Sequence, residues 1–460
     1  MKAKRKPIQF YLLCTLLLLA FTSEAQPVTK IATGGQFNLF LKSDGSLWGM
    51  GRNDFGELGD GTYNTSSPHY GTNQPEQIVI SGVTKIAAGD SHSLFLKSDG
   101  SLWAMGFNHY GGLGDGTYSN TNSPEQIVSS GVTAIAAGDS YSLFLKSDGS
   151  LWAMGYNGYG GLGDGTYNNT NSAEQIVASG VTAISARGLH SMFIKSDGSL
   201  WVMGDNMYGQ LGDGIYNLVS PYGTNHPQQI VSSGVTAIAA GYSHSLFLKS
   251  DGSLWAMGLN NEGQLGDGTY NNANSPEFVA SGVIAIAAGD NHSFFIKSDG
   301  SLWAMGYNQY GQLGDGTYSS NAPYFATNRP ELIVASNITA IAGGNAHSIF
   351  LKSDGSLWAM GQNFYAQLGD GTFNNTNRPE QIVVNSSYNQ ISGQLLSGGN
   401  MSLSFFGNAG VNYALDRSFN LAPPNWIPQV TNSANSFGAL VFTNTPVATT
   451  NNFWRIRSVP

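Results

Sequence analysis

The chain has 460 residues, of which only 11% are charged, and its formal net charge is −9. This acidic balance argues against binding nucleic acid through its phosphates, which requires clustered Lys and Arg. A hydrophobic content of 41% argues against a disordered chain, and the 60 glycines suit a turn-rich β protein.

The first 25 residues have the pattern of a secretory signal peptide. Basic residues precede an apolar run from Phe10 to Phe21, and Ser23-Glu24-Ala25 offers small residues to a signal peptidase. The run is too short to span a bilayer. We expect cleavage after Ala25 and a mature chain that is secreted or held at the cell surface, with no transmembrane segment. The only cysteine, Cys14, would leave with the signal, so no disulfide is expected.

A heptapeptide, KSDGSLW, occurs seven times without a change, at intervals of 48 to 55 residues. The copies begin at Lys42, Lys97, Lys146, Lys195, Lys249, Lys297 and Lys352. A period of this size is typical of stacked units, none of which can bury its own faces alone.

Each unit contains about four short segments with the composition of β-strands. In the second unit, Ser93–Lys97 and Ser101–Met105 are short and apolar, and Asp99-Gly100 supplies the positive φ angles of a two-residue hairpin turn. Apolar periodicity of helical length is absent from the mature chain. We therefore predict an all-β chain in which each unit is one blade of a propeller.

The unit resembles the regulator of chromosome condensation repeat. The resemblance rests on the run A-G-x-x-H-S-L-F-L-K-S-D-G-S-L-W-A-M-G-x-N-x-x-G-Q-L-G-D-G, which is clearest from Ala240 to Gly268 and covers the chain from Val28 to Val384. It implies a seven-bladed β-propeller and, with the export signal, a secreted bacterial member of the family. The first copy departs most, because it lacks the histidine and serine that most other copies share.

Residues 26–393 are predicted to form the propeller, and residues 394–460 a small C-terminal β-sandwich-like module with an accessory role. A propeller must close its ring, commonly by pairing strands from the two ends of the repeat array. Either Val28–Thr33 or a partial eighth copy at Tyr388–Gly393 could supply the closing strand. The sequence leaves both open.

No residue pattern indicates catalysis. Gly89-Asp90-Ser91 resembles the start of a serine esterase motif and His92 lies beside it, but a sister unit has Gly188-Leu189-His190 at the same place. A repeated element does not by itself provide one nucleophile held against one base. We predict that the protein is not an enzyme and has no catalytic residue.

Two repeated polar positions are interpreted as structural. One position holds histidine in five units and, in this alignment, Asn38 and Tyr141 in the other two; we expect it to hydrogen-bond a neighbouring strand or turn. The histidines are His92, His190, His244, His292 and His347. The Asp of each L-G-D-G, such as Asp60, lacks the spacing of a calcium loop and is expected to form a turn. Neither a metal nor a cofactor is predicted.

The two ends of the heptapeptide receive different interpretations. Its tryptophans are expected to be core residues that pack blade against blade, because a large aromatic ring in every unit supplies apolar surface to bury. Its lysines are expected to be solvated charges beside the hairpin turn.

The positions that vary between units are the candidates for binding, because an invariant frame would present them as loop residues. The residue between Gly and Asn of each G-x-N motif gives Arg52, Phe107, Tyr156, Asp205, Leu259, Tyr307 and Gln362. Three units carry a longer loop at one fixed point, which gives Tyr70, Tyr222 and Tyr324. An aromatic residue three positions after the first set is expected to pack under its loop.

The leading functional hypothesis is a secreted, non-enzymatic and monomeric propeller that binds a protein or glycan partner through loops on one face, as an inhibitor or an adhesion scaffold. The resemblance supports the inhibitor role, because secreted bacterial propellers of this family include β-lactamase inhibitors. It also implies an alternative, guanine nucleotide exchange, which is the activity of the family's namesake. An extracellular hydrolase is the third hypothesis.

Overall fold

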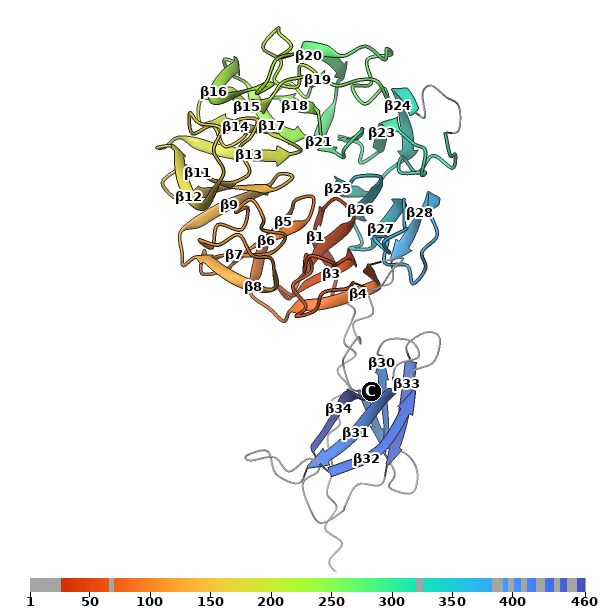
Figure 1. Ribbon diagram of the computed structural model, residues 1–460. Coiled ribbons are helices and arrows are strands. Elements are labelled where there is room, and N and C mark those ends of the chain that lie inside the picture. The colour runs from red at the N-terminus through yellow and green to blue at the C-terminus, as the bar shows by residue number, and fades with distance from the viewer. Residues whose placement is uncertain are drawn as a thin grey trace, which may run out of the picture.

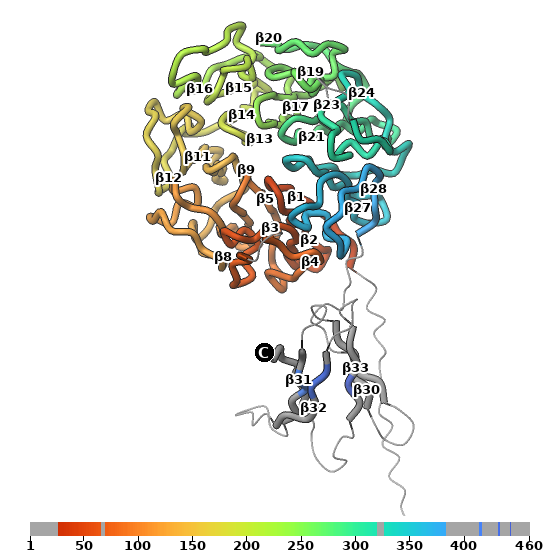
Figure 2. Tube along the Cα trace, turned by 45° about the vertical axis from the view of Figure 1, so that its right-hand side comes forward, coloured from red at the N-terminus to blue at the C-terminus, as the bar shows by residue number. Residues whose placement is uncertain are grey.

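The computed structural model describes residues 26–65, 70–319 and 326–382, and beyond them the strands between Ser392 and Val459. The expected signal peptide and Tyr324 lie outside the described residues. Seven four-stranded sheets stand around a central axis, and the first strand of each lies nearest that axis (Figures 1 and 2). The predicted seven-bladed, all-β propeller is therefore confirmed, and no helix occurs in the described part of the chain.

Each blade is a continuous stretch of the chain. Blades 1 to 4 are β1–β4 (Val28–Thr33, Phe37–Lys42, Leu47–Arg52, Gly71–Val79), β5–β8 (Val83–Ala88, His92–Lys97, Leu102–Gly106, Thr121–Val128), β9–β12 (Val132–Ala137, Tyr141–Lys146, Leu151–Gly155, Thr170–Val177) and β13–β16 (Val181–Arg187, His190–Lys195, Leu200–Asp205, Gly223–Val231). Blades 5 to 7 are β17–β20 (Val235–Ala240, His244–Lys249, Leu254–Gly258, Ala273–Ala280), β21–β24 (Val283–Ala288, His292–Lys297, Leu302–Tyr307, Ala326–Val334) and β25–β28 (Ile338–Gly343, His347–Lys352, Leu357–Gly361, Thr376–Ile382).

The hairpin between the second and third strands follows from the heptapeptide. In blade 2, Phe95 pairs with Trp103, and Gly100 has the positive φ of 77° that the turn requires. The Asp99 carboxylate accepts the Ser101 N–H at 2.9 Å, which fixes the turn from its own side chain. The turn lies at the predicted place, but it is not the predicted two-residue turn: of the pair, Gly100 alone has positive φ, and the Lys97 N–H donates to Ser101 O at 3.1 Å across a three-residue loop.

The core lies between blades. Leu94, Leu102 and Leu113 of blade 2 are buried against Phe144 and Met154 of blade 3, and equivalent clusters occur at the other interfaces. Burying such side chains contributes roughly 1.5–3 kcal/mol each, so stability is gained where two blades meet. A single blade would expose one side of this core.

The heptapeptide tryptophans pack between blades, as expected, although six of the seven are only half-buried. Each ring stacks on a phenylalanine of its own blade, with centroids 6.0–6.3 Å apart. The lysine interpretation needs correction, since every heptapeptide Lys Nζ lies 3.7–4.5 Å from the centroid of the Trp ring. The hairpin brings the strand-ending Lys beside the ring, which gives a cation–π contact.

The ring closes without exchange of strands. β1 pairs with β2 inside blade 1, and Phe40 and Trp48 of this blade share a buried cluster with Leu351 and Leu368 of blade 7. Backbone bonds also cross this seam, for example from Val28 N to Gly355 O at 3.2 Å. Side-chain packing and local hydrogen bonds therefore hold blade 7 against blade 1, where other propellers pair strands from the two ends of the chain.

The C-terminal strands form two three-stranded antiparallel sheets. One has the order β29-β30-β33 (Ser392–Leu395, Met401–Phe406, Ala439–Asn444) and the other β32-β31-β34 (Ile427–Ser433, Asn412–Ser418, Phe453–Val459). Leu415 and Phe442 are fully buried. β29 pairs with β30, so its residues, which overlap the partial eighth copy, belong to this sheet. The rest of that copy, from Tyr388 to Ile391, lies outside the described residues.

Candidate binding face

The antiparallel order of each blade puts two loops on the same side of the ring. In blade 2, β5 ends at Ala88, β6 begins at His92 and β7 ends at Gly106, and these ends are neighbours in the sheet. The loops after the first and third strands therefore share one face, which we call the loop face. The KSDG turns lie on the opposite face, and the G-x-N residues lie on the loop face.

A buried asparagine organises the long loop of every blade. In blade 1, Asn53 Oδ1 accepts the Leu58 N–H at 3.0 Å, and Asn53 Nδ2 donates to Asp60 Oδ1 at 3.0 Å. Asp60 in turn accepts the Thr62 N–H at 2.8 Å. The same Asn–Asp bond occurs in all seven blades. The interpretation of the L-G-D-G aspartates as turn residues is confirmed.

The repeated histidines join neighbouring blades. His92 Nε2 lies 2.9 Å from Ser142 Oγ of blade 3, and this hydroxyl donates to Gly112 O at 2.7 Å. Because the hydroxyl hydrogen is committed to Gly112, the histidine must donate from Nε2. Burial lowers the pKa of His92 to about 4, which keeps the ring neutral. The expected hydrogen bonding to a neighbouring strand is confirmed.

The alignment of the first unit was wrong by one residue. Phe37 pairs with Gly51 as His92 pairs with Gly106, so Phe37 and not Asn38 occupies the histidine position. Asn38 takes the place of the serine: its Oδ1 lies 2.8 Å from His347 Nε2 of blade 7. The sequence suggested the other alignment because asparagine is polar, like the histidine it was matched to.

The G-x-N residues are less exposed than expected for side chains that only contact a binding partner. Six of the seven are half-buried, and Asp205 is buried, with 7% of its surface exposed. Asp205 Oδ2 accepts a hydrogen bond from Gln210 Nε2 at 2.8 Å, and burial raises the pKa of its carboxyl. This side chain supports its own loop.

In five of the seven blades the polarity of the G-x-N residue matches that of the residue five places later, a relation that sequence reasoning missed; Leu259 and Tyr307 depart from it, because glutamine stands five places after each. Arg52 faces buried Glu57 at 3.8 Å, and Gln367 Nε2 donates to Gln362 at 3.3 Å. The pairs in chain order are Arg52–Glu57, Phe107–Gly112, Tyr156–Gly161, Asp205–Gln210, Leu259–Gln264, Tyr307–Gln312 and Gln362–Gln367. The signal was present in the sequence as matched polarity, with glycine beside Phe107 and Tyr156.

Aromatic residues form a continuous arc over blades 7, 1, 2, 3 and 4 of the loop face. The Arg52 guanidinium lies over both Tyr365, at 5.7 Å, and Phe55, at 4.9 Å. From Phe55 the ring contacts continue at centroid distances of 5.0–6.3 Å. We call this set the aromatic arc; in order it is Tyr365, Phe55, Phe107, Tyr110, Tyr156, Tyr159 and Tyr222, with Arg52 as its link.

The tyrosines of the longer loops pack onto the preceding blade. The Tyr70 ring lies 6.5 Å from Tyr365, and the Tyr222 ring lies 6.2 Å from Tyr159. Both tyrosines also have positive φ, and their carbonyls accept the N–H of the loop asparagine, from Asn53 at 2.9 Å in blade 1. The longer loops thus extend the aromatic arc.

The other side of the loop face, over blades 5, 6, 7 and 1, is hollowed and polar. A hollow of about 390 Å³ opens there, and we call it the polar hollow. Its wall consists of five carboxamides, two tyrosines and one carboxylate, which are Gln36, Asn261, Asn291, Asn345, Gln362, Tyr307, Tyr310 and Glu262. Of the predicted residues, Tyr307 and Gln362 belong to this wall, and Leu259 belongs to neither the hollow nor the arc.

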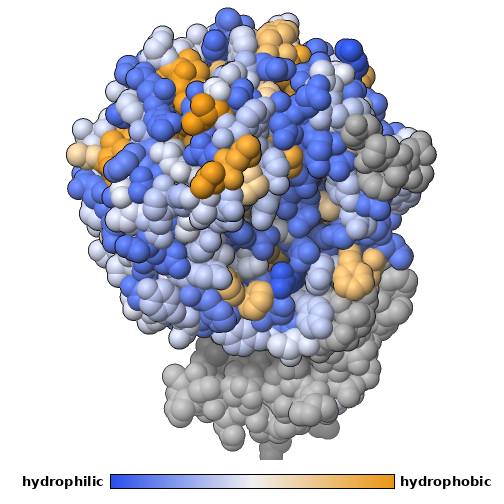
Figure 3. Space-filling model, turned by 45° about the horizontal axis from the view of Figure 1, so that its top comes forward, coloured by the Kyte–Doolittle hydropathy of each residue, from blue (hydrophilic) through white to orange (hydrophobic). Residues whose placement is uncertain are grey.

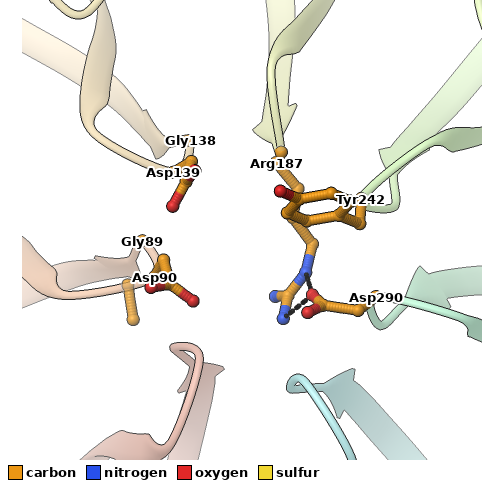
Figure 4. Close-up of a pocket in the computed structure, with 9 residues that line it drawn as sticks. Gly89, Asp90, Gly138, Asp139, Arg187, Tyr242 and Asp290 are labelled. Carbon is orange, nitrogen blue, oxygen red and sulfur yellow. Dashed lines mark hydrogen bonds and ion pairs between the residues drawn. The ribbon is translucent and has the colours of Figure 1, made fainter. Parts of the chain in front are cut away.

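A charged cluster lies where the loops after the first strands meet at the central axis. Arg187 replaces the glycine of its repeat and reaches from blade 4 to Asp290 of blade 6, with Nε 2.8 Å from Oδ1. Figure 4 shows Asp90 and Asp139 across the opening from Arg187 and Tyr242. Sequence reasoning missed this cluster, although an Arg at a glycine position was a visible departure.

The acidic surroundings change the ionisation of this cluster. Burial, together with repulsion from Asp90 and Asp290, raises the pKa of Asp139 to about 7. Burial, together with repulsion from Asp139, Asp290 and Asp90, raises the pKa of Tyr242 to about 12. Arg187 is the cation that lines this opening, and it opposes the rise at Asp139.

No group of three or more His, Cys, Asp or Glu side chains within the described ranges is arranged to hold a metal ion. No helix in that part of the chain is long and apolar enough to cross a membrane.

Two curated relatives share short segments with this chain. Human HERC4, a probable E3 ubiquitin-protein ligase, is 30% identical over 94 residues, which are 20% of this chain and 9% of HERC4. The X-linked retinitis pigmentosa GTPase regulator homolog of Caenorhabditis elegans is 37% identical over 95 residues, which are 20% of this chain and 6% of that protein. This chain therefore spans less than a tenth of the length of these relatives.

Solved structures share the fold over most of the chain. Human WBSCR16 has a TM-score of 0.62 at 23% identity and covers 71% of this chain and 88% of its own. Prp20p of Saccharomyces cerevisiae has a TM-score of 0.66 at 20% identity, and the match covers 80% of this chain and 89% of Prp20p. That protein is described with binding properties to Gsp1p and histones. A family model described as RCC1-like domain matches residues 14–317 and 181–413. This match covers most of the chain and agrees with the seven blades, so the chain belongs to the family of RCC1-like domains.

Proposed function

We propose that this protein is a secreted, non-enzymatic propeller that binds a protein or glycan partner through its loop face. The aromatic arc carries this proposal. Aromatic side chains are favoured anchors at binding interfaces, because they bury a large area and lose few rotamers. Here they stand on the loops of five blades, each held by the same Asn–Asp bond, so little order has to be created on binding.

A second feature of the loop face supports a partner of substantial size. The long loop of blade 4 departs from its sisters and exposes Leu218 and Val219, at 71% and 80%. Figure 3 shows apolar residues in separate spots on a largely hydrophilic surface. Such spots suit a partner held by a few anchors better than a broad apolar interface.

Affinity capture from the medium and envelope of the producing cells tests the proposal. The mature chain from Gln26 is compared with an arc variant, Phe107→Leu with Tyr156→Leu, because Leu259 already stands at this position in blade 5. Ile80→Ser is the matched control: Ile80 is 80% exposed on the opposite face, and blade 2 has Ser129 at the same place.

The expected result is a partner that the mature chain and Ile80→Ser retain and the folded arc variant loses. Equal capture by all three would show that the arc does not bind, and capture of nothing would contradict the proposal as a whole. The alternatives have separate assays, since nucleotide release from a GTPase would favour exchange, and hydrolysis abolished by Ser91→Ala would favour an enzyme.

A further inference from the structure

The polar hollow differs from the aromatic arc in chemistry, although both lie on the loop face. Its wall has five carboxamides and one carboxylate, and neither Lys nor Arg lines it. A carboxamide both donates and accepts hydrogen bonds, and a sugar hydroxyl does the same. The wall therefore matches a ligand with many hydroxyls and no negative charge.

Several polar groups of the wall are uncommitted. Within the described residues, no hydrogen bond joins the side-chain amide of Asn261, Asn291 or Asn345 to another residue, and all three keep exposed surface. By contrast, Gln36 accepts from Arg52 and Gln362 accepts from Gln367. Three amides are thus free to bind a ligand without breaking an internal bond, which lowers the cost of binding.

Two buried donors lie in the loops that form the wall. Gln264 Oε1 accepts the Glu262 N–H and Gln312 Oε1 accepts the Tyr310 N–H, but neither Nε2 has a partner among the described residues. In blades 4 and 7 the equivalent Nε2 donates to Asp205 and Gln362. Leu259 and Tyr307 replace those acceptors in blades 5 and 6. Both side chains are fully buried and neither lines the hollow, so the amides of Asn261, Asn291 and Asn345, which keep exposed surface, are the ones that a ligand can reach.

Tyrosine rings complete the wall. Tyr307 and Tyr310 are neighbours, with ring centroids 6.1 Å apart. An aromatic face binds the apolar C–H face of a pyranose ring, while amides at the side bind its hydroxyls. The volume of about 390 Å³ lies within the range of small-molecule sites, roughly 300–1,000 Å³.

We propose that the polar hollow binds a neutral carbohydrate, such as one or two pyranose units of a glycan chain. This inference rests on the proposed function and names the ligand class for one part of the loop face. Glu262 disfavours acidic sugars, because its carboxylate lines the hollow and would repel a second negative charge. Asn291, Asn345 and Tyr307 are the residues that contact the sugar.

A glycan array with neutral oligosaccharides (glucans, mannans, galactans and N-acetylglucosamine oligomers) and acidic ones (sialylated and uronic) tests the inference on the mature chain. The hollow variant is Asn291→Ser with Tyr307→Leu. Both replacements occur at the same places in sister blades, as Ser91 and Leu259, so the variant is expected to fold. Asn345→Gly, which copies Gly35, is a second variant, and Ile80→Ser is the control.

We expect binding to neutral oligosaccharides that the hollow variant weakens at least tenfold and Ile80→Ser leaves unchanged. No binding to any oligosaccharide, preference for acidic ones, or full binding by the folded hollow variant would overturn the inference. If glycans fail but a partner is captured and the arc variant loses it, the proposed function stands without the sugar site. Loss of glycan binding by the arc variant alone would place the ligand on the arc. Failure of both capture and array would contradict both proposals.

Discussion

The seam between blades 7 and 1 uses the same hydrogen bonds as the interfaces between consecutive blades, although its residues are about 300 positions apart. Between blades 2 and 3, Asn171 Nδ2 donates to Gly116 O at 2.8 Å and Gly116 N donates to Asn171 O at 2.9 Å. At the seam, Asn73 and Gly371 exchange the same two bonds at 3.0 and 2.8 Å. The backbone bond from this glycine N–H to the asparagine carbonyl occurs at all seven interfaces of the ring.

One residue distinguishes the seam. At four interfaces a serine accepts from the histidine of the preceding blade and donates to a carbonyl there, whereas blade 1 uses Asn38. Asn38 Oδ1 accepts from His347, and Asn38 Nδ2 donates to Gln367 O at 2.5 Å. A serine hydroxyl accepts and donates through one oxygen, whereas the Asn38 amide accepts through Oδ1 and donates through Nδ2. Closure thus depends on side-chain chemistry, and the chain needs no shared strand.

The largest effect is expected from Asn38→Leu. Leucine has a similar volume but leaves the His347 donor and the Gln367 carbonyl buried without partners. At about 1–3 kcal/mol for each group, the free energy of unfolding should fall by roughly 2–6 kcal/mol in urea denaturation. Asn38→Ser restores the residue of the other interfaces and should lose much less. Equal losses for the two variants would show that this bond network does not hold the seam.

Arg187→Gly should have the next largest effect. The change restores the glycine of the other blades but leaves Asp290 buried without its cation, and breaking such a pair costs about 3 kcal/mol at the low end of the usual range. Adding Asp290→Asn removes the uncompensated charge and should recover part of this loss. Urea denaturation of the two single variants and the double variant gives the coupling. Strictly additive losses would mean that the ion pair across the axis contributes nothing.

A pH-dependent change is expected from His92→Phe, which copies Phe37 of the seam blade. The folded pKa of His92 is about 4, below the unfolded value of about 6.5, so this residue stabilises the fold above pH 6.5 and loses that contribution as the pH falls toward 4. Between pH 7 and pH 5 the wild-type chain should lose about 2 kcal/mol more than the variant. Thermal or urea unfolding at both pH values measures the difference, and identical pH dependence would refute the assignment of a buried neutral ring.

The blades could be predicted from the sequence because their determinants are local. Asp99-Gly100 makes its turn within one hairpin, and the bond from His92 to Ser142 was expected because histidine recurs in five blades and serine follows that position in six. Arg187 could not be placed, because its partner Asp290 lies about 100 residues later, two blades away across the central axis.

The candidate site was predicted in part, for a related reason. The aromatic residues Phe107 and Tyr156 were recognisable as loop residues of one face. The polar hollow combines residues of four blades, from Gln36 to Gln362, and no periodicity indicates which neighbours face one another across it. The role of Asp205 was missed although its polar partner, Gln210, stands only five residues later in the same loop.

The smallest expected effect is a difference in stability between two lysine variants, one in the seam blade and one in an internal blade. Lys97 lies 3.9 Å from the centroid of Trp103, and Lys97→Gln should cost about 0.5–1 kcal/mol, the value of an exposed cation–π contact. Lys42 makes the same contact with Trp48, but burial lowers its pKa to about 8. Lys42→Gln removes this desolvation cost together with the contact, so its net effect should be close to zero. The urea midpoints of the two variants measure this difference in stability. A loss of unfolding free energy for Lys42→Gln as large as that for Lys97→Gln would mean that burying Lys42 carries no desolvation cost.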